Sequence, residues 1–230
     1  MNKKTIILIV DSPVLNPTII KPVENLSIKY SVYLNSLLIS NWLEILNETE
    51  NTEIIILLNE LDKEYLPKNF IPPNVNIFFY PSHGLEAILQ EVLKQKILPN
   101  SKTLILFHNS IGVKKGEVER IFNLVQSEES TFVLLKSKRK KIISVCAYNP
   151  DKVITEALFS SNRDYEDYLN IISGKDIFIH TLEGYISIDD FEDIKKLYIE
   201  LSKKESLSFC STEMHESFND LFVEYKEILT

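Results

Sequence analysis

Polar side chains that could bind a ligand stand after the short apolar runs of this sequence. They are Asp11, Ser12, His108, Asn109 and Ser110, with Lys21 in the loop after the first run and Asp189 downstream of the last. Such runs, rich in β-branched residues, are typical of strands buried on both faces of a sheet. Because ligands of an open α/β sheet bind outside the carboxyl ends of its strands, we expect these side chains at one edge of a sheet.

The scarcity of glycine excludes two phosphate-binding loops. The chain has 230 residues and five glycines, and none of them falls into the G-x-G-x-x-G pattern or the P-loop pattern G-x-x-x-x-G-K-[ST]. The net charge of −8 argues against general nucleic-acid binding, which depends on neutralising phosphate. With 44% hydrophobic and 25% charged residues, the composition is that of a globular protein.

The remaining sequence features favour a cytoplasmic protein. Cys146 and Cys210 make neither a disulfide framework nor a zinc site, because neither has a Cys or His partner at ligand spacing. No apolar run approaches the roughly 20 residues of a membrane span. The sequence has no G-x-S-x-G elbow either, so hydrolase chemistry of the Ser-His type has no support.

The segment 136–141 concentrates five positive charges in six residues. Such a run could attract an anionic sugar nucleotide or a nucleic acid. It stands between two apolar runs, however, and no aromatic residue interrupts it. A solvated hairpin turn is the preferred interpretation, and no nucleic-acid partner is predicted.

Apolar runs alternate with helical patterns along the chain. Strands are predicted at 5–10, 54–58, 75–80, 103–107, 131–135, 142–147 and 177–182. Helices are predicted at 27–46, 86–96, 117–126, 152–159 and 165–172, with two more around 191–201 and 214–225. This alternation predicts a three-layer α/β/α fold with a mostly parallel, mixed sheet. No linker or repeat divides the chain, so a single domain over 1–230 is expected.

Residues 187–194 read S-I-D-D-F-E-D-I and open one of the two C-terminal helices. Ser187 is predicted to be the N-cap, with Asp190 three residues on in a variant of the capping box. Carboxylates here would also favour the positive end of the helix dipole. On this ground Asp189 is expected to belong to the helix start.

The order of these segments resembles the nucleotide-diphospho-sugar transferase superfamily, which has the GT-A type of fold, and within it a bacterial glycosyltransferase branch. Members of that branch carry a K-T-R loop, then G-x-D-x-P, D-G-G-Y and D-V-D-T-P-E-D-L. The agreements with the last motif are Asp189, Glu192, Asp193 and Ile194. Lys21 stands for the lysine of K-T-R, Asn109 for the Asp of G-x-D-x-P, and 135–145 contain no counterpart of D-G-G-Y.

The resemblance implies a nucleotide site with a divalent cation. The residues expected to bind the nucleotide are Asp11, Ser12, Lys21, His108, Asn109 and Ser110. Asn109 and Asp189 would hold Mg²⁺ or Mn²⁺, although Asn109 offers a neutral amide oxygen where the family has a carboxylate. The alternative for 108–110 is a strand-end loop whose polar groups satisfy the backbone.

Two of these residues keep a second interpretation, and so does the function. Asp11 could accept a hydrogen bond from a base or ribose hydroxyl, or it could cap the turn at Ser12. Lys21 could bind a β-phosphate as a point charge, or it could be a solvated loop lysine. The activity implied is transfer of a sugar or nucleotidyl group from a nucleotide donor. The alternative is a catalytically inactive relative that serves as a binding or partner module.

Overall fold

The computed structural model describes residues 3–96, 101–126 and 130–229. Its strands are β1 (Lys3–Ile9), β2 (Thr52–Asn59), β3 (Val75–Tyr80), β4 (Ser101–Phe107), β5 (Ser110–Ile111), β6 (Thr131–Ser137), β7 (Ile142–Tyr148) and β8 (Phe178–Ser187). Its helices are α1 (Ile28–Asn47), α2 (Leu85–Lys96), α3 (Glu117–Leu124), α4 (Lys152–Ser160), α5 (Tyr165–Ile172), α6 (Phe191–Leu201), α7 (Thr212–Glu224) and α8 (Lys226–Leu229), with the 3-10 helices η1 (Glu60–Tyr65) and η2 (Lys204–Ser208). Every predicted strand and helix has a counterpart here.

The strands form one mixed sheet in the order β3-β2-β1-β4-β7-β6-β8-β5. β1 is parallel to β2 and β4, and β2 is parallel to β3. β7 is antiparallel to β4 and β6, β8 is parallel to β6, and the short β5 is antiparallel to β8. The strand order reverses where β4 lies beside β1, and a ligand site is expected outside the carboxyl ends of these two strands.

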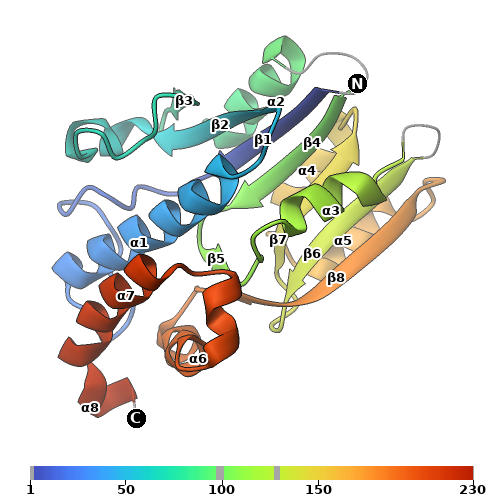
Figure 1. The fold of residues 1–230 in the computed structure, drawn as a ribbon. Helices are drawn as coiled ribbons and strands as arrows, with labels where there is room; N and C mark the ends of the chain where they lie inside the picture. Colours follow the sequence, from blue (N-terminus) through green and yellow to red (C-terminus); the bar gives the residue numbers. More distant parts are fainter. Residues whose placement is uncertain (1–2, 97–100, 127–129, 230) are drawn as a thin grey trace.

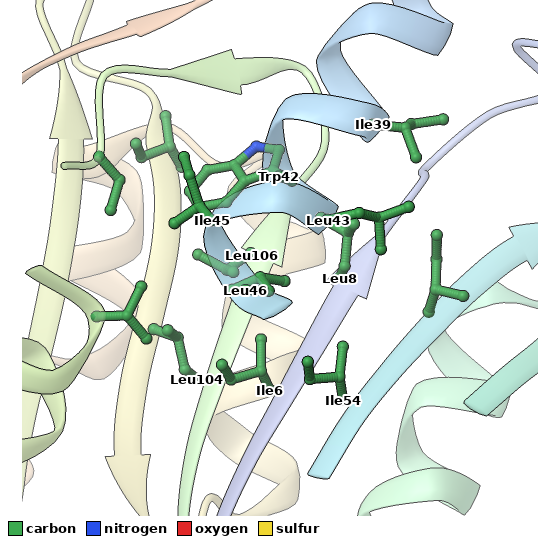
Figure 2. Packing of buried hydrophobic residues seen from close by; sticks show 14 of the residues in the cluster. Ile6, Leu8, Ile39, Trp42, Leu43, Ile45, Leu46, Ile54, Leu104 and Leu106 are labelled. Atoms are coloured by element: carbon green, nitrogen blue, oxygen red, sulfur yellow. The ribbon is translucent and has the colours of Figure 1, made fainter. Parts of the chain in front are cut away.

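Helices cover both faces of the sheet (Figure 1). Side chains alternate along β1, so Ile6 and Leu8 pack in one cluster with α1 and α3, while Ile7 and Ile9 pack in another with α2. Figure 2 shows Trp42 of α1 within the first of these clusters. α4 and α5 cover β6 and β7, and α6, α7 and α8 pack with α1 in a cluster beside β5. The prediction of a three-layer α/β/α fold is confirmed.

The structure corrects the predicted start of α6. β8 continues to Ser187, with a shift of its register against β6 around Gly184, whose φ is 107°. The N-cap of α6 is Asp190, and its side chain accepts a hydrogen bond from the N–H of Asp193. The prediction of Ser187 as the N-cap is therefore wrong, because Ser187 is the last residue of β8, where it pairs with Ser110, and the N-cap lies three residues later.

The strand β5 has no counterpart among the predicted elements. Ser110 and Ile111 follow β4 after a short loop and pair with Ser187 and Ile186 of β8. Two residues are too few to create a periodic pattern. This pairing brings the loop after β4 next to the segment that leads into α6.

As for membrane insertion, no helix in the three described ranges has the length and apolarity to cross a bilayer.

Candidate functional site

A cavity of about 400 Å³ opens at the carboxyl ends of β1 and β4. Its walls come from the loops after these two strands, the turn between α4 and α5, and the segment between β8 and α6. The predicted site residues in its lining are Asp11, Ser12, Lys21, His108, Asn109 and Asp189. The fold therefore brings together six of the seven residues singled out in the sequence.

Ser110 is the predicted residue that does not line this cavity. Its side chain is buried, and its hydroxyl donates a hydrogen bond to the carbonyl oxygen of Phe107 at 2.7 Å. It belongs to β5, where it pairs with Ser187. Ser110 satisfies the backbone at the end of a strand, as short polar residues commonly do.

Arg163, in the turn between α4 and α5, lines the cavity and was not predicted. Its Nη1 donates a hydrogen bond to Oδ1 of Asn109 at 3.0 Å. Its Nη2 lies 3.3 Å from Oδ2 of Asp11 and 3.9 Å from Oδ1 of Asp189. The guanidinium also lies over the ring of Phe107, 4.4 Å from the centroid, where cation–π attraction holds it further. Three predicted side chains thus share one cation.

The backbone fixes the direction of this arginine. Arg163 has a φ of 62°, a left-handed conformation that is uncommon for residues other than glycine. Its N–H donates to the carbonyl of Leu158, and its carbonyl accepts from the N–H of Ile142. A sequence signal existed, since Arg163 is one of three arginines in the chain and arginine suits partly buried ion pairs. It stands, however, between two helices and follows no strand.

Asp189 is held through its side chain and its backbone. Nδ2 of Asn109 donates to Oδ1 of Asp189 at 2.9 Å, and the N–H of Asp189 donates to Oδ2 of Asp193 at 3.2 Å. The buried Asp193 also accepts from Arg139 and Lys196, each at 2.9 Å. The Asp189 carboxylate therefore faces Asn109 and Arg163, while the next residue, Asp190, is the N-cap of α6.

His108 forms a buried part of the cavity wall. Its Nε2 lies 3.0 Å from Oδ1 of Asn35 in α1. Its Nδ1 lies 3.8 Å from Oδ1 of Asp11 and has no hydrogen-bond partner within the described residues. Burial lowers the pKa of His108; the charge of Asp11 opposes this effect and that of Arg163 adds to it. In the neutral ring with Nε2 protonated, Nδ1 is a free acceptor at the cavity wall.

The buried Asp62 of η1 anchors the loop that carries Ser12 and Lys21. Its carboxylate accepts hydrogen bonds of 2.9 to 3.0 Å from the backbone N–H groups of Val14, Leu15 and Asn16. Burial raises the pKa of Asp62, and these three donors oppose the rise. Lys21 itself is exposed, and its ammonium group has no ion-pair partner in the part of the chain that the structure describes.

The residues around the cavity do not fit a divalent metal ion. Oδ1 of Asn109 accepts from Arg163 and its Nδ2 donates to Asp189, so both predicted ligands are engaged. Among residues 3–96, 101–126 and 130–229, no group of three or more His, Cys, Asp and Glu side chains could hold a metal ion. A cation at these oxygens would also face the Arg163 guanidinium, which repels it.

The basic segment 136–141 is a hairpin between β6 and β7, as predicted, and lies outside the cavity. Its ion pairs are Lys136 with Glu183, Lys138 with Glu200, Arg139 with Asp190 and Asp193, and Lys140 with Glu166. These four cations are paired with acidic residues away from the cavity, and none of them lines it.

A larger cavity, of about 800 Å³, lies at the other end of β1 and contains none of the predicted site residues. Lys4, in its wall, is paired with Glu119 of α3. Its wall also contains charged side chains, among them Lys3, Glu48 and Glu50. It lies, however, at the amino end of β1, whereas open α/β sheets bind their ligands outside the carboxyl ends of the strands.

No protein-family model matches the sequence, and the search of curated proteins finds no match. Solved structures do match over most of the chain. A protein from Desulfovibrio desulfuricans G20, assigned as a nucleotide-diphospho-sugar transferase, is 11% identical, with 98% of this chain and 99% of that chain covered and a TM-score of 0.70.

Two further neighbours show the same architecture. The 4-diphosphocytidyl-2C-methyl-D-erythritol synthase of Anaerococcus prevotii DSM 20548 is 16% identical, with 88% and 97% of the two chains covered and a TM-score of 0.57. Rv0371c of Mycobacterium tuberculosis H37Rv, in complex with manganese, is 9% identical, with 86% and 98% covered and a TM-score of 0.53. At these identities the likeness concerns the fold. The chain has the fold of the nucleotide-diphospho-sugar transferases.

Proposed function

We propose that the cavity binds a nucleotide and that the protein is a transferase, either a glycosyltransferase that uses a nucleotide sugar as donor or a nucleotidyltransferase that uses a nucleoside triphosphate. The observation that carries the proposal is the convergence at one cavity of six residues chosen from the sequence. The cavity lies where α/β sheets bind their ligands, outside the carboxyl ends of adjacent parallel strands. The Anaerococcus neighbour has the same fold and is named as the synthase of a compound with a diphosphocytidyl group, which is a nucleotide.

The cavity offers partners for the separate parts of a nucleotide. Lys21 is an exposed cation for a phosphate, and the Ser12 hydroxyl in the same wall is a hydrogen-bond donor. Asp11 would accept a hydrogen bond from a base or ribose hydroxyl. The apolar part of the wall, which includes Val14 and Ile188, suits the face of a base.

A second candidate function is a catalytically inactive binding module. It is favoured by Arg163, which engages Asn109 and Asp189, the two residues expected to hold a catalytic metal ion. Binding of a nucleotide is common to both candidates. They differ in whether a bound donor is consumed.

Thermal melting with CTP, CDP, UDP, UDP-sugars and GDP-sugars tests binding, because a ligand of the folded state alone raises the melting temperature. We expect a shift with at least one nucleotide, lost in Lys21→Ala and retained in Lys175→Ala, a matched control at an exposed lysine outside the cavity. No shift with any nucleotide would contradict the proposal.

The donor that gives the largest shift then separates the two candidates. Incubation with that donor, with water or an added sugar alcohol, sugar or sugar phosphate as the acceptor of the transferred group, and chromatography of the nucleotide products measure its consumption. Release of nucleotide or pyrophosphate that Lys21→Ala abolishes supports the transferase. Binding without consumption supports the binding module.

A further inference from the structure

We infer that Arg163 is the resident cation of this cavity, and that phosphate groups bind against its guanidinium without a divalent metal ion. The nature of the ligand rests on the proposed function. The exclusion of the metal ion rests on the surroundings of Arg163 alone. The structure of one neighbour in fold, Rv0371c, is a manganese complex.

Arg163 engages the oxygens that a divalent cation would need. Asn109 Oδ1 lies 3.0 Å from Nη1, and Oδ2 of Asp11 lies 3.3 Å from Nη2. Oδ1 of Asp189 lies 3.9 Å from the same Nη2. The three oxygens come from the loops after β1 and β4 and from the segment before α6. Mg²⁺ and Mn²⁺ require several such oxygens at once, and here they surround a positive charge.

The guanidinium keeps the capacity to bind phosphate. Each Nη nitrogen carries two hydrogens, and Asn109 takes one of those on Nη1. The side chain is 14% exposed and lines the cavity. Planar N–H donors of arginine bind phosphate oxygens strongly, and Lys21 in the same wall adds a second positive charge. Two linked phosphates would thus meet two cations, and they would approach Arg163 from the side away from Asp11 and Asp189, whose carboxylates lie 3.3 and 3.9 Å from Nη2.

Two features fix the guanidinium before any ligand arrives. Its backbone is held in the left-handed region with a φ of 62°, and backbone strain of this kind is concentrated at functional sites. Its plane rests on the Phe107 ring of β4. A cation that is already ordered loses little conformational entropy on binding, which is also the advantage of a fixed metal ion.

Titration of the nucleotide-free protein with Mn²⁺, followed by the electron paramagnetic resonance signal of the free ion, tests the exclusion of metal. We expect no binding by the wild type and binding by Arg163→Met, in which Asp11 and Asp189 lose their shared counterion. Arg139→Met, which removes an arginine of the exposed hairpin, should behave like the wild type.

Two results would overturn the inference. One is stoichiometric binding of Mn²⁺ by the wild type that Asp189→Asn removes. The other is failure of a folded Arg163→Met to bind Mn²⁺. If Arg163→Met does not fold, the comparison of the wild type with Asp189→Asn still decides the question.

Calorimetry with inorganic pyrophosphate, CDP and UDP, in EDTA and in Mg²⁺, tests the role of Arg163 toward phosphate. We expect dissociation constants within about threefold in the two media, and a loss of about tenfold or more in Arg163→Met but not in Arg139→Met. Binding that requires Mg²⁺ would overturn the inference. Absence of binding in both media would refute the proposed function, while the Mn²⁺ titration would still test the metal exclusion.

Discussion

Two groups of positive charge in this protein differ in their surroundings. The hairpin 136–141 carries five cations. Lys136 belongs to β6 and is 17% exposed, whereas Arg139 and Lys140 in the turn are 46% and 59% exposed. Arg163 is a single cation, 14% exposed, between Asp11 and Asp189 at the cavity. The hairpin is conspicuous in the sequence and Arg163 is not.

The difference shows that burial decides what a charge contributes. Exposed ion pairs are screened by water and are worth little. A cation enclosed by carboxylates leaves them uncompensated when it is removed, which is costly. The effective dielectric constant around a partly buried cation is lower than in water. An anionic ligand therefore interacts with it more strongly than with a cation on the surface. The dense basic run therefore tells less about function than one arginine at the end of the sheet.

The largest effect is expected from Arg163→Met, which leaves Asp11 and Asp189 without their shared counterion. Because these carboxylates are partly exposed, the loss should be about 2 kcal/mol in the free energy of unfolding, less than for a fully buried pair. Urea denaturation at neutral pH measures it. A loss no greater than that of Arg139→Met would contradict the distinction between the two groups of charge.

A pH-dependent effect of intermediate size is expected from His108. Because its pKa is lowered in the folded state, the unfolded chain takes up the proton first as the pH falls below about 6.5. This group therefore destabilises the fold on acidification, by at most about 1.4 kcal/mol per pH unit.

Melting curves between about pH 7.5 and about pH 5.5 measure this contribution. The melting temperature of His108→Gln should fall less over this range than that of the wild type. An equal fall in both proteins would show that His108 does not titrate as its burial demands.

A smaller effect is expected from Arg139→Met. Asp193 is buried, but it keeps Lys196 and the N–H of Asp189 as partners when Arg139 is removed. The loss in the free energy of unfolding should therefore be about 0.5 to 1 kcal/mol. Denaturation with urea alongside the wild type gives the value, and a loss above that of Arg163→Met would reverse the ranking.

No measurable effect is expected from Lys140→Ala. Both Lys140 and its partner Glu166 are exposed to solvent, and pairs of this kind contribute little in water. The melting temperature and the nucleotide affinity should equal those of the wild type. A clear drop in affinity would show that the hairpin contacts the ligand after all.

The sheet and its helices could be predicted from local patterns. Buried runs such as Ile54–Leu58 have a continuous apolar signature, and the predicted helices have their periodic apolar faces. Asp11 and Asn109 could be placed at the site because they directly follow strands. The other features of the site depend on contacts between residues that are far apart in the sequence.

Two features of the site depend on such long-range contacts. Arg163 reaches the cavity through a turn that packs against the start of β7, far away in the sequence from Asp11. Ser187 stays in β8 because it pairs with Ser110 of β5. No local sequence pattern predicts that Arg163 reaches the cavity or that Ser187 belongs to a strand.

The most direct test is a crystal structure of the wild type grown with Mn²⁺ and the nucleotide that gives the largest melting shift, with anomalous data collected at the manganese edge. The account predicts phosphate oxygens within hydrogen-bond distance of the Arg163 guanidinium and no anomalous peak between Asp11 and Asp189. A manganese ion between these carboxylates, or a nucleotide bound elsewhere, would contradict it.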